Sequence, residues 1–312
     1  GDNRYFFIWD MTTHETVYQR RTEGQGSMLV WSDSHSIPKS SRYPAYVLCT
    51  AFDGLVSKHD LQFNISTMAY EMTSAPFRLP ASGLQRKYNC GVIRDDQLIA
   101  GTSGGEICVF SLDAMVFRAS LPCVNHGVNA LCAGPVPVNG MGAAGEGTYF
   151  VGGGDGRIKL VTGYDTTWEV TSENILPGGV KSMGIEASGS ELVIGTENGK
   201  IWRVLCTDLT ATLSITGHTG PVTGVAFGTA SDKVVTVSKT GECYVWDLSS
   251  YSLVGSITRS GTSCSCVCMT NSGQIIIGYE DGTVRAYPYE GVTEARDFDW
   301  HIAGAHQGAV TT

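Results

Sequence analysis

The chain has 312 residues, of which 42% are hydrophobic, 16% are charged and 39 are glycine. This composition is too apolar for a disordered protein and too rich in glycine for a helical one. The net charge is −9 and no basic run is longer than the two residues of Arg20-Arg21, so nucleic acid is a poor candidate ligand, because its binding depends on neutralising phosphates. With no 18-residue apolar run and no signal peptide, we expect a soluble, intracellular protein with no membrane partner.

One short phrase recurs along the chain: a β-rich run, a tight turn that usually contains glycine, and a second β-rich run ending in a bulky residue. It first appears in the opening GDNRYFFIWD, where Arg4 stands in the place of the glycine, and then as the weaker copy LCTAFDGLVSKHD (48–60). The clearer copies are LIAGTSGGEICVF (98–110), YFVGGGDGRIKLV (149–161), LVIGTENGKIWRV (192–204), VVTVSKTGECYVW (234–246) and IIIGYEDGTVRAY (275–287).

The spacing of these copies predicts the fold. A repeat of about 40–50 residues with two strands at its core is typical of a β-propeller of the WD-repeat type. Turns such as Asn198-Gly199 supply the positive φ angles of a type I′ hairpin. We therefore predict an all-β propeller of about seven blades, each with four antiparallel strands. The closing residues are Trp9, His59, Phe110, Val161, Val204, Trp246 and Tyr287, at intervals of 50, 51, 51, 43, 42 and 41 residues.

We expect a single propeller region over residues 1–312, with the strands of each blade lettered a to d from the centre outward. The chain would open with strands c and d of a partial blade (1–21) and end with the start of another (303–312). Residues 308–312 would supply strand a to the first blade, which would still lack strand b. We therefore expect a section of a longer, tandem-propeller chain. The complete blades are expected near 45–71, 88–121, 127–173, 179–215, 217–257 and 262–302.

One unit carries more of a known pattern. Residues 217–247, GHTGPVTGVAFGTASDKVVTVSKTGECYVWD, begin with Gly-His, end with Trp-Asp and resemble a WD repeat. In the WD-repeat family a His, a strand hydroxyl, a turn Asp and the Trp form a buried hydrogen-bonded network. The resemblance implies that His218, Thr236 or Ser238, and Trp246 take three of these roles. Thr240 stands where the turn Asp should be, so we expect an incomplete network with a structural role.

The order of the divergent blades resembles a narrower family, over most of residues 45–311. The resemblance is to the tandem-propeller WD-repeat cilia- and flagella-associated proteins, which are microtubule inner proteins of motile axonemes. It implies a non-catalytic scaffold of the ciliary or flagellar axoneme that contacts tubulin and luminal proteins and supports motility. The alternative is a general cytoplasmic WD-repeat adaptor that assembles a multiprotein complex, such as the substrate receptor of a ubiquitin ligase. The matching runs are GSELVIGTENGKIWRVLCTDLTATLSITGHTGPVTGVAFG (189–228), ECYVWDLSSYSLVGSI (242–257), IIIGYEDGTVRAYPYEG (275–291) and IAGAHQGAVT (302–311).

Strings that suggest catalysis have simpler explanations. The glycine-rich stretch 152–156 is followed by a strand, whereas a phosphate-binding loop leads into a helix. Cys264, Cys266 and Cys268 would share one strand face about 7 Å apart, but zinc needs a fourth ligand, so reduced cysteines that pack as small apolar residues are the better interpretation. We expect no catalytic residue, no metal site and no cofactor; an enzyme working in the central channel is a third, weaker alternative.

Loops are where partner contacts are expected, because function tends to lie on loops held by a rigid scaffold. Residues 31–43 are predicted to connect two blades, and residues 134–147 to separate strands a and b of one blade; both would be tolerated insertions or partner contacts. We expect the partner face to carry the b–c turns and the connections between blades. Its exposed candidates are Glu197, Asn198, Lys239, Thr240, Glu280 and Asp281.

Overall fold

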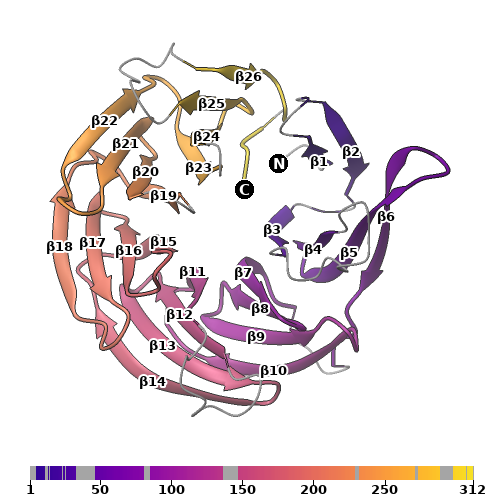
Figure 1. Ribbon diagram of the computed structural model, residues 1–312. Helices are drawn as coiled ribbons and strands as arrows, with labels where there is room; N and C mark the ends of the chain where they lie inside the picture. The colour runs from indigo at the N-terminus through magenta and orange to yellow at the C-terminus, as the bar shows by residue number, and fades with distance from the viewer. Residues whose placement is uncertain are drawn as a thin grey trace.

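The computed structural model shows sheets arranged radially around a common centre (Figure 1). The residues that it describes are 5–10, 13, 15–22, 24, 26–32, 46–80, 85–135, 147–228, 232–270, 273–288, 298–306 and 308–311. These residues contain strands and no helix, so the all-β prediction is confirmed. None of them forms a helix with the length and apolar character needed to cross a bilayer.

Each blade is a four-stranded antiparallel sheet whose strands follow one another in sequence, with the first strand innermost. Blade 1 comprises β3 (Gly26–Trp31), β4 (Tyr46–Phe52), β5 (Leu55–Asn64) and β6 (Ala69–Pro76), and blade 2 comprises β7 (Tyr88–Arg94), β8 (Gln97–Thr102), β9 (Glu106–Ser111) and β10 (Val116–Pro122). Blade 3 comprises β11 (Val128–Ala133), β12 (Gly147–Gly153), β13 (Arg157–Tyr164) and β14 (Thr167–Ile175), and blade 4 comprises β15 (Val180–Ile185), β16 (Glu191–Thr196), β17 (Lys200–Leu205) and β18 (Ala211–Thr216). Blade 5 comprises β19 (Val222–Phe227), β20 (Lys233–Ser238), β21 (Glu242–Asp247) and β22 (Leu253–Thr258), and blade 6 comprises β23 (Cys264–Met269), β24 (Gln274–Tyr279), β25 (Val284–Pro288) and β26 (Trp300–Ile302).

The described residues form six complete blades, and the prediction of about seven is wrong. The remaining strands, β1 (Tyr5–Trp9) and β2 (Thr16–Arg21), form a two-stranded sheet beside blade 6 in the ring. The prediction counted seven closing residues, and each of these marks the end of a strand c. A complete blade also needs a strand b before the turn. In the first copy of the phrase, the described residues supply only the run that follows the turn.

Strand b is the buried core of each blade, because it lies between the neighbouring blades as well as between strands a and c. All six residues of β8 are buried, and in β16 and β20 only the first residue is not. The outermost strand β14 has no fully buried residue. The near-continuous apolar runs of the phrase are explained by this burial on both faces.

Neighbouring blades pack through a recurrent pair of positions. A glycine near the end of strand b receives a valine at the start of the next strand a, and a Cβ atom on the glycine would clash with that valine. In blade 5 the strand-b position is Val237, and the next strand a starts with Cys264, which is smaller than Val; both are buried in one hydrophobic cluster. The glycine–valine pairs are Gly101 with Val128, Gly152 with Val180, Gly195 with Val222 and Gly278 with Val310.

The two long loops both lie inside blades. Residues 31–43 join β3 to β4, which pair antiparallel with Trp31 opposite Leu48, so the prediction that they connect two blades is wrong. The error arises because β3 has no glycine turn of its own to mark it as strand a. Residues 134–147 join β11 to β12, the first two strands of blade 3, as predicted. Residues 33–45 and 136–146, which make up most of the two loops, lie outside the described residues.

Candidate functional site

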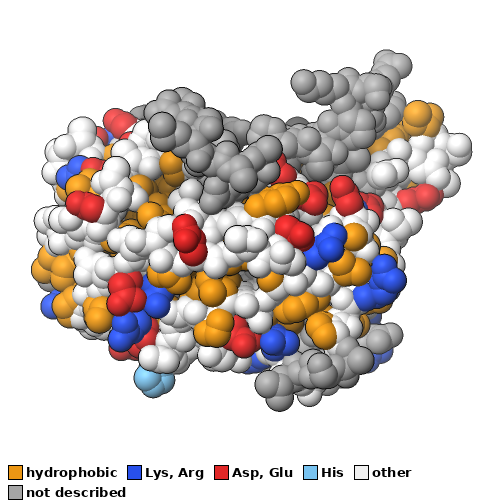
Figure 2. Space-filling model, turned by 90° about the horizontal axis from the view of Figure 1, so that it is seen from below, with side chains coloured by type: hydrophobic (Ala, Val, Ile, Leu, Met, Phe, Trp, Pro, Cys, Tyr) orange, Lys and Arg blue, Asp and Glu red, His pale blue; other side chains and the backbone are white. Residues whose placement is uncertain are grey.

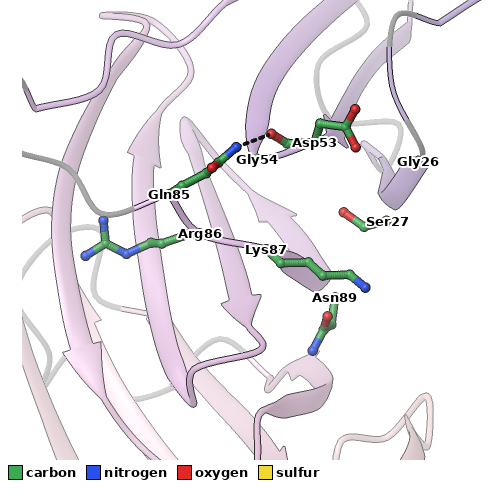
Figure 3. Close-up of a pocket in the computed structure, with 8 residues that line it drawn as sticks. All are labelled: Gly26, Ser27, Asp53, Gly54, Gln85, Arg86, Lys87 and Asn89. Atoms are coloured by element: carbon green, nitrogen blue, oxygen red, sulfur yellow. Dashed lines mark hydrogen bonds between the residues drawn. The ribbon is translucent and has the colours of Figure 1, made fainter.

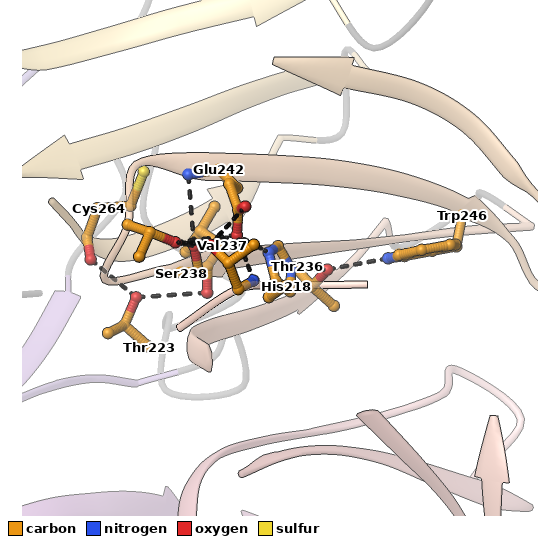
Figure 4. Close-up of polar contacts among 10 residues, drawn as sticks. His218, Thr223, Thr236, Val237, Ser238, Glu242, Trp246 and Cys264 are labelled. Carbon is orange, nitrogen blue, oxygen red and sulfur yellow. Dashed lines mark hydrogen bonds and ion pairs between the residues drawn. The ribbon is translucent and has the colours of Figure 1, made fainter. Parts of the chain in front are cut away.

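Blade 5 contains a buried line of hydrogen bonds that runs across three of its elements (Figure 4). The Thr236 hydroxyl, in strand b, lies at its centre. It accepts a hydrogen bond from Trp246 Nε1 at 2.9 Å and lies 2.8 Å from His218 Nε2. On the other side of the imidazole ring, His218 Nδ1 lies 3.2 Å from Glu242 Oε2. All four residues are buried.

The protonation state of His218 gives these bonds a direction. Burial lowers the pKa of His218, and the neighbouring Glu242 carboxylate only partly opposes this, so the ring is neutral at pH 7. A neutral imidazole has one donor and one acceptor. Since a carboxylate can only accept, His218 Nδ1–H donates to Glu242, and Nε2 accepts the Thr236 hydroxyl proton. Each polar atom along the line from Trp246 to Glu242 thus has a partner.

Glu242 is a member of this network that sequence reasoning missed. Its Oε2 atom accepts hydrogen bonds from Ser238 Oγ at 3.0 Å, Thr240 Oγ1 at 2.9 Å and Thr219 N at 3.0 Å. Burial raises the pKa of this carboxyl group, but the hydrogen bonds outweigh that effect and lower it to about 2. We expected the network to lack a carboxylate, because Thr240 stands at the position of the turn Asp. Glu242, two residues further along the chain, supplies the carboxylate instead. The alternation of side chains along a strand could have indicated this role. Glu242 and Trp246 are four residues apart, so their side chains share one face of β21.

The other blades use different residue pairs at the same two positions. In blade 1, His59 replaces the Trp and its Nε2 atom lies 2.7 Å from the hydroxyl of Thr50 in strand b. In blade 2, the Thr–Trp pair is replaced by Ala100 and Phe110, which need no hydrogen bond. The network is therefore one of several ways in which side chains join strands b and c of a blade, and its structural role stays a prediction.

The six predicted partner-face residues are all exposed and lie in the b–c turns of blades 4, 5 and 6. These turns contact the connections between blades: Asn198 Nδ2 donates to Pro177 O at 2.8 Å, and Glu197 Oε1 accepts from Gly179 N at 3.1 Å. The turns and the connections therefore lie in contact with one another; that they form a partner face stays a prediction.

Only two of the six have side chains that are free for a partner. Asp281 forms an ion pair with Arg259 at 2.8 Å, and Thr240 belongs to the blade 5 network. Glu197 and Asn198 hold the adjacent connection. Within the described part of the chain, no hydrogen bond or ion pair engages the side chains of Lys239 and Glu280.

A polar pocket of about 740 Å³ lies on the same kind of surface, between the b–c turn of blade 1 and the segment that leads into β7 (Figure 3). The Lys87 ammonium group, the Ser27 hydroxyl and the Asp53 carboxylate lie around it, whereas Arg86 points away, where its Nε atom is 2.8 Å from Glu106 Oε2. The pocket thus combines an ammonium group, an amide, a hydroxyl and a carboxylate, which are donors and acceptors of hydrogen bonds. The residues that line it are Gly26, Ser27, Asp53, Gly54, Gln85, Arg86, Lys87 and Asn89.

The outer wall of the ring has a mixed surface. In Figure 2, apolar, acidic and basic side chains are interspersed over the coloured part of this wall, and neither sign of charge forms a continuous patch there. The outermost strand of blade 3, β14, contributes two exposed apolar side chains, Val170 and Ile175, which are 38% and 56% exposed. The described residues on this side therefore form no basic stripe of the kind that binds nucleic acid.

The cysteines are all free, and most are buried. In β23, Cys264 is buried, Cys266 is half-buried and Cys268 is exposed. Burial raises the pKa of Cys264 to about 12 and that of Cys266 to about 11, so both are protonated thiols at neutral pH. In the described ranges, no three His, Cys, Asp or Glu residues are placed to hold a metal ion together.

Sequence comparisons connect the chain to known proteins. A family model for the nucleolar protein 10-like N-terminal domain, a β-propeller, matches residues 64–293. Cilia- and flagella-associated protein 52 of Chlamydomonas reinhardtii is 26% identical over 259 residues, which make up 80% of this chain and 40% of that protein. The mouse WD repeat-containing protein 90 is 27% identical over 61% of this chain and 11% of its own length. The chain thus spans two fifths or less of these relatives.

Solved structures agree on the fold. The computationally designed Ika8 protein superposes with a TM-score of 0.66 at 17% identity, covering 99% of this chain and 84% of its own. A chain of the mitotic checkpoint complex superposes with a TM-score of 0.67 at 13% identity, covering 91% and 78%. At these identities the likeness concerns the propeller fold alone.

Proposed function

The chain belongs to the family of the nucleolar protein 10-like N-terminal domain, and we propose that it is a non-catalytic interaction scaffold of the ciliary or flagellar axoneme. The observation that carries this proposal is the similarity to a cilia- and flagella-associated WD-repeat protein over 80% of the chain. Relatives of the same name in human, pig, mouse and cattle also match. More finely, the scaffold would be a microtubule inner protein that contacts tubulin and other luminal proteins.

The geometry supports a scaffold in two ways. The polar groups of the blade 5 network bond to one another inside the blade, so they are not available to a substrate. The exposed b–c turns are fixed to the adjacent connections by hydrogen bonds, which presents their side chains on a rigid face. A rigid face with few mobile groups suits binding to another protein surface, because little conformational entropy is lost on association.

Localisation tests the proposal. Tagged protein expressed in a ciliated cell should stay with axonemes after detergent removes the membrane and matrix. Release with the detergent-soluble matrix, or abundance in cells that lack cilia, would favour the alternative of a general cytoplasmic adaptor. A nucleolar signal would instead follow the name of the family, and would also contradict the axonemal proposal.

The contact face can be tested separately with one charge reversal. Glu280→Lys should weaken capture of axonemal partners, because its side chain is exposed and makes no bond within the described residues. The matched control is Glu169→Lys, which makes the same change on the exposed outer strand β14. Equal capture by both variants would exclude the b–c face of blade 6 without affecting the localisation result.

A further inference from the structure

The turns between strands c and d of blades 1, 2, 4 and 5 share one conformation. In each, four residues join the last paired positions of the two strands, and the first and last of the four are hydrophobic. The fourth residue always has a positive φ angle, between 51° and 59°, which is uncommon for a residue other than glycine. The four turns are residues 65–68, 112–115, 206–209 and 248–251.

In blades 2, 4 and 5 the hydrophobic residues of this turn pack on the preceding blade. Leu112 is buried in the hydrophobic cluster that joins blade 2 to blade 1, and Leu209 is buried in the cluster that joins blade 4 to blade 3. In blade 5 the Tyr251 hydroxyl donates to Glu191 Oε2 of blade 4 at 2.8 Å. In these three blades the turn therefore has a neighbour within the ring that covers it.

In blade 1 the corresponding pair, Ile65 and Met68, is exposed. Their side chains are 64% and 69% exposed, the two highest values among the large hydrophobic side chains of the described residues. The reason is the length of the hairpin: β5 has ten residues and β6 has eight, whereas strands c and d of blades 2, 4 and 5 have six or seven. Figure 1 shows the β5–β6 hairpin projecting beyond the rim of the ring.

Hydrogen bonds hold the projecting turn in one shape. Glu71 Oε1 accepts from Asn64 Nδ2 at 2.8 Å and from Thr67 Oγ1 at 3.0 Å. Asn64 Oδ1 in turn accepts from Ser66 N at 2.8 Å. The exposed pair is therefore presented on an ordered structure, which would lose little conformational entropy on binding. Hydrophobic side chains exposed together in this way are characteristic of an interaction site.

The charge beside the turn defines what its partner must carry. Glu71 is the only charged residue between Leu61 and Thr73. Its side chain is exposed, and its Oε2 atom accepts no hydrogen bond from the described residues. A carboxylate that is pressed against another protein loses water, and a Lys or Arg on that protein is the group that best replaces this water.

We propose that residues 65–68, which we call the apolar tip, insert Ile65 and Met68 into an apolar pocket of another protein, with a Lys or Arg at the rim of that pocket facing Glu71. The apolar clusters that cover the same turn in blades 2 and 4 show what kind of surface fits it. The tip points away from the ring (Figure 1), so a separate protein is the proposed occupant. It would bind such a pocket whether or not the protein is axonemal.

Photo-crosslinking tests whether another protein covers the apolar tip. The photoreactive residue p-benzoylphenylalanine is placed at position 68 of the tagged protein at its natural length. Irradiation of cells that make this protein should give a covalent complex with one other protein. Mass spectrometry should locate the crosslink in an apolar pocket of that protein with a Lys or Arg at its rim. If the complex also forms in cells without cilia, the tip is supported and the axonemal proposal is contradicted.

The matched control places the same photoreactive residue at position 254. Val254 is a hydrophobic residue of the outer strand β22 with an exposure of 52%, and its replacement should not give this complex. Crosslinks that join position 68 only to the protein's own chain would show that this chain covers the tip, and the proposal would be wrong. The same complex from both positions, or none from position 68, would also overturn it.

Affinity measurements with the purified crosslinked protein test the apolar contact. Ile65→Ser should weaken binding at least about tenfold in isothermal titration calorimetry, because it removes a side chain that the pocket buries. Val254→Ser should change the affinity little. Both side chains are exposed, so neither variant should differ much from the unsubstituted protein in thermal unfolding. Equal affinities of the two variants would contradict insertion of the tip.

A charge-neutral variant tests the basic rim. Glu71→Gln keeps an oxygen that can accept from Asn64 and Thr67 and removes the negative charge. It should weaken binding about fivefold at low salt and less at high salt, because salt screens the attraction that it removes. Replacing the facing Lys or Arg of the partner by Gln should then have little further effect. Unchanged affinity of Glu71→Gln at low salt would overturn the basic rim.

Discussion

Blade 5 can be compared with the β1–β2 sheet and the nearby residues 305–306 and 308–311, which together we call the seventh position. The two regions carry the same kinds of side chain, but within the described residues only blade 5 has a strand b. Both have a buried His four residues before a Val, and both have a Trp-Asp pair at the end of strand c. In blade 5, strand b covers the Trp, which is 4% exposed, and its Thr236 joins the His to the Trp. In the seventh position the same kinds of side chain border a cavity. A blade is therefore completed by its strand b, and the pair of His and Trp alone does not complete it.

The largest expected difference in the free energy of unfolding is between replacing Trp246 of blade 5 and replacing Trp9 of the seventh position. Trp246→Ala should lower the free energy of unfolding by about 4 kcal/mol, because it deletes a large side chain from a packed core. Trp9→Ala should cost about 1 kcal/mol, because Trp9 is half-exposed beside a cavity. Urea denaturation of both variants measures the difference; equal losses would mean that the seventh position is as well packed as blade 5.

The Thr236 hydroxyl of strand b should account for much of the remaining difference in stability between blade 5 and the seventh position. Thr236→Val should lower the free energy of unfolding by about 3 kcal/mol, because it leaves the buried Trp246 N–H without an acceptor and His218 Nε2 without a donor. Thr236→Val combined with Trp246→Phe reproduces the apolar solution of blade 2. The double variant should be more stable than the sum of the two single effects predicts, and strict additivity in urea denaturation would argue against the hydrogen bond.

Acid should weaken the seventh position. Burial lowers the pKa of His306 to about 4 from an ordinary value of 6.5, so the folded state keeps this ring neutral. The unfolded chain takes up a proton below pH 6.5 and the folded chain does not, so stability is complete above pH 6.5 and declines as the pH falls toward 4. At pH 5 the loss is about 2 kcal/mol. His306→Asn should therefore lose about that much less stability than the unsubstituted protein between pH 7 and pH 5 in urea denaturation; identical losses would contradict the assignment.

The smallest effect on stability is expected on the partner face. Glu280→Lys should change the free energy of unfolding by less than about 0.5 kcal/mol, because the side chain is exposed and makes no bond within the described residues. Asp281→Lys should cost more, since it breaks the ion pair with Arg259 and the bond from Thr283 N to the carboxylate. Thermal unfolding of the two variants separates a surface residue from a structural one, and equal losses would show that the distinction is wrong.

The sequence predicted those parts of the fold that depend on local turns. Each glycine turn brings strands b and c together, so the recurring phrase located most hairpins, and the Gly-His and Trp-Asp pairs located the residues of the blade 5 network. It missed β3, because a first strand makes no such turn, and it placed residues 31–43 between blades for that reason. Sequence reasoning also missed Glu242. In blade 5 this carboxylate at the start of strand c takes the place in the network that a turn Asp was expected to have. Such replacements depend on three-dimensional proximity, which spacing alone does not reveal.

Hydrogen exchange can compare the open edge of β1 with the covered strand β21 in a single sample. In the 312-residue protein, the backbone amides of Phe6–Trp9 should exchange at least about 100-fold faster than those of Cys243–Trp246, because among the described strands β1 has one neighbour and β21 has two. Mass spectrometry of peptides from the two strands measures both rates. Equal protection of β1 and β21 would show that the seventh position is already complete, and would contradict the missing strand b.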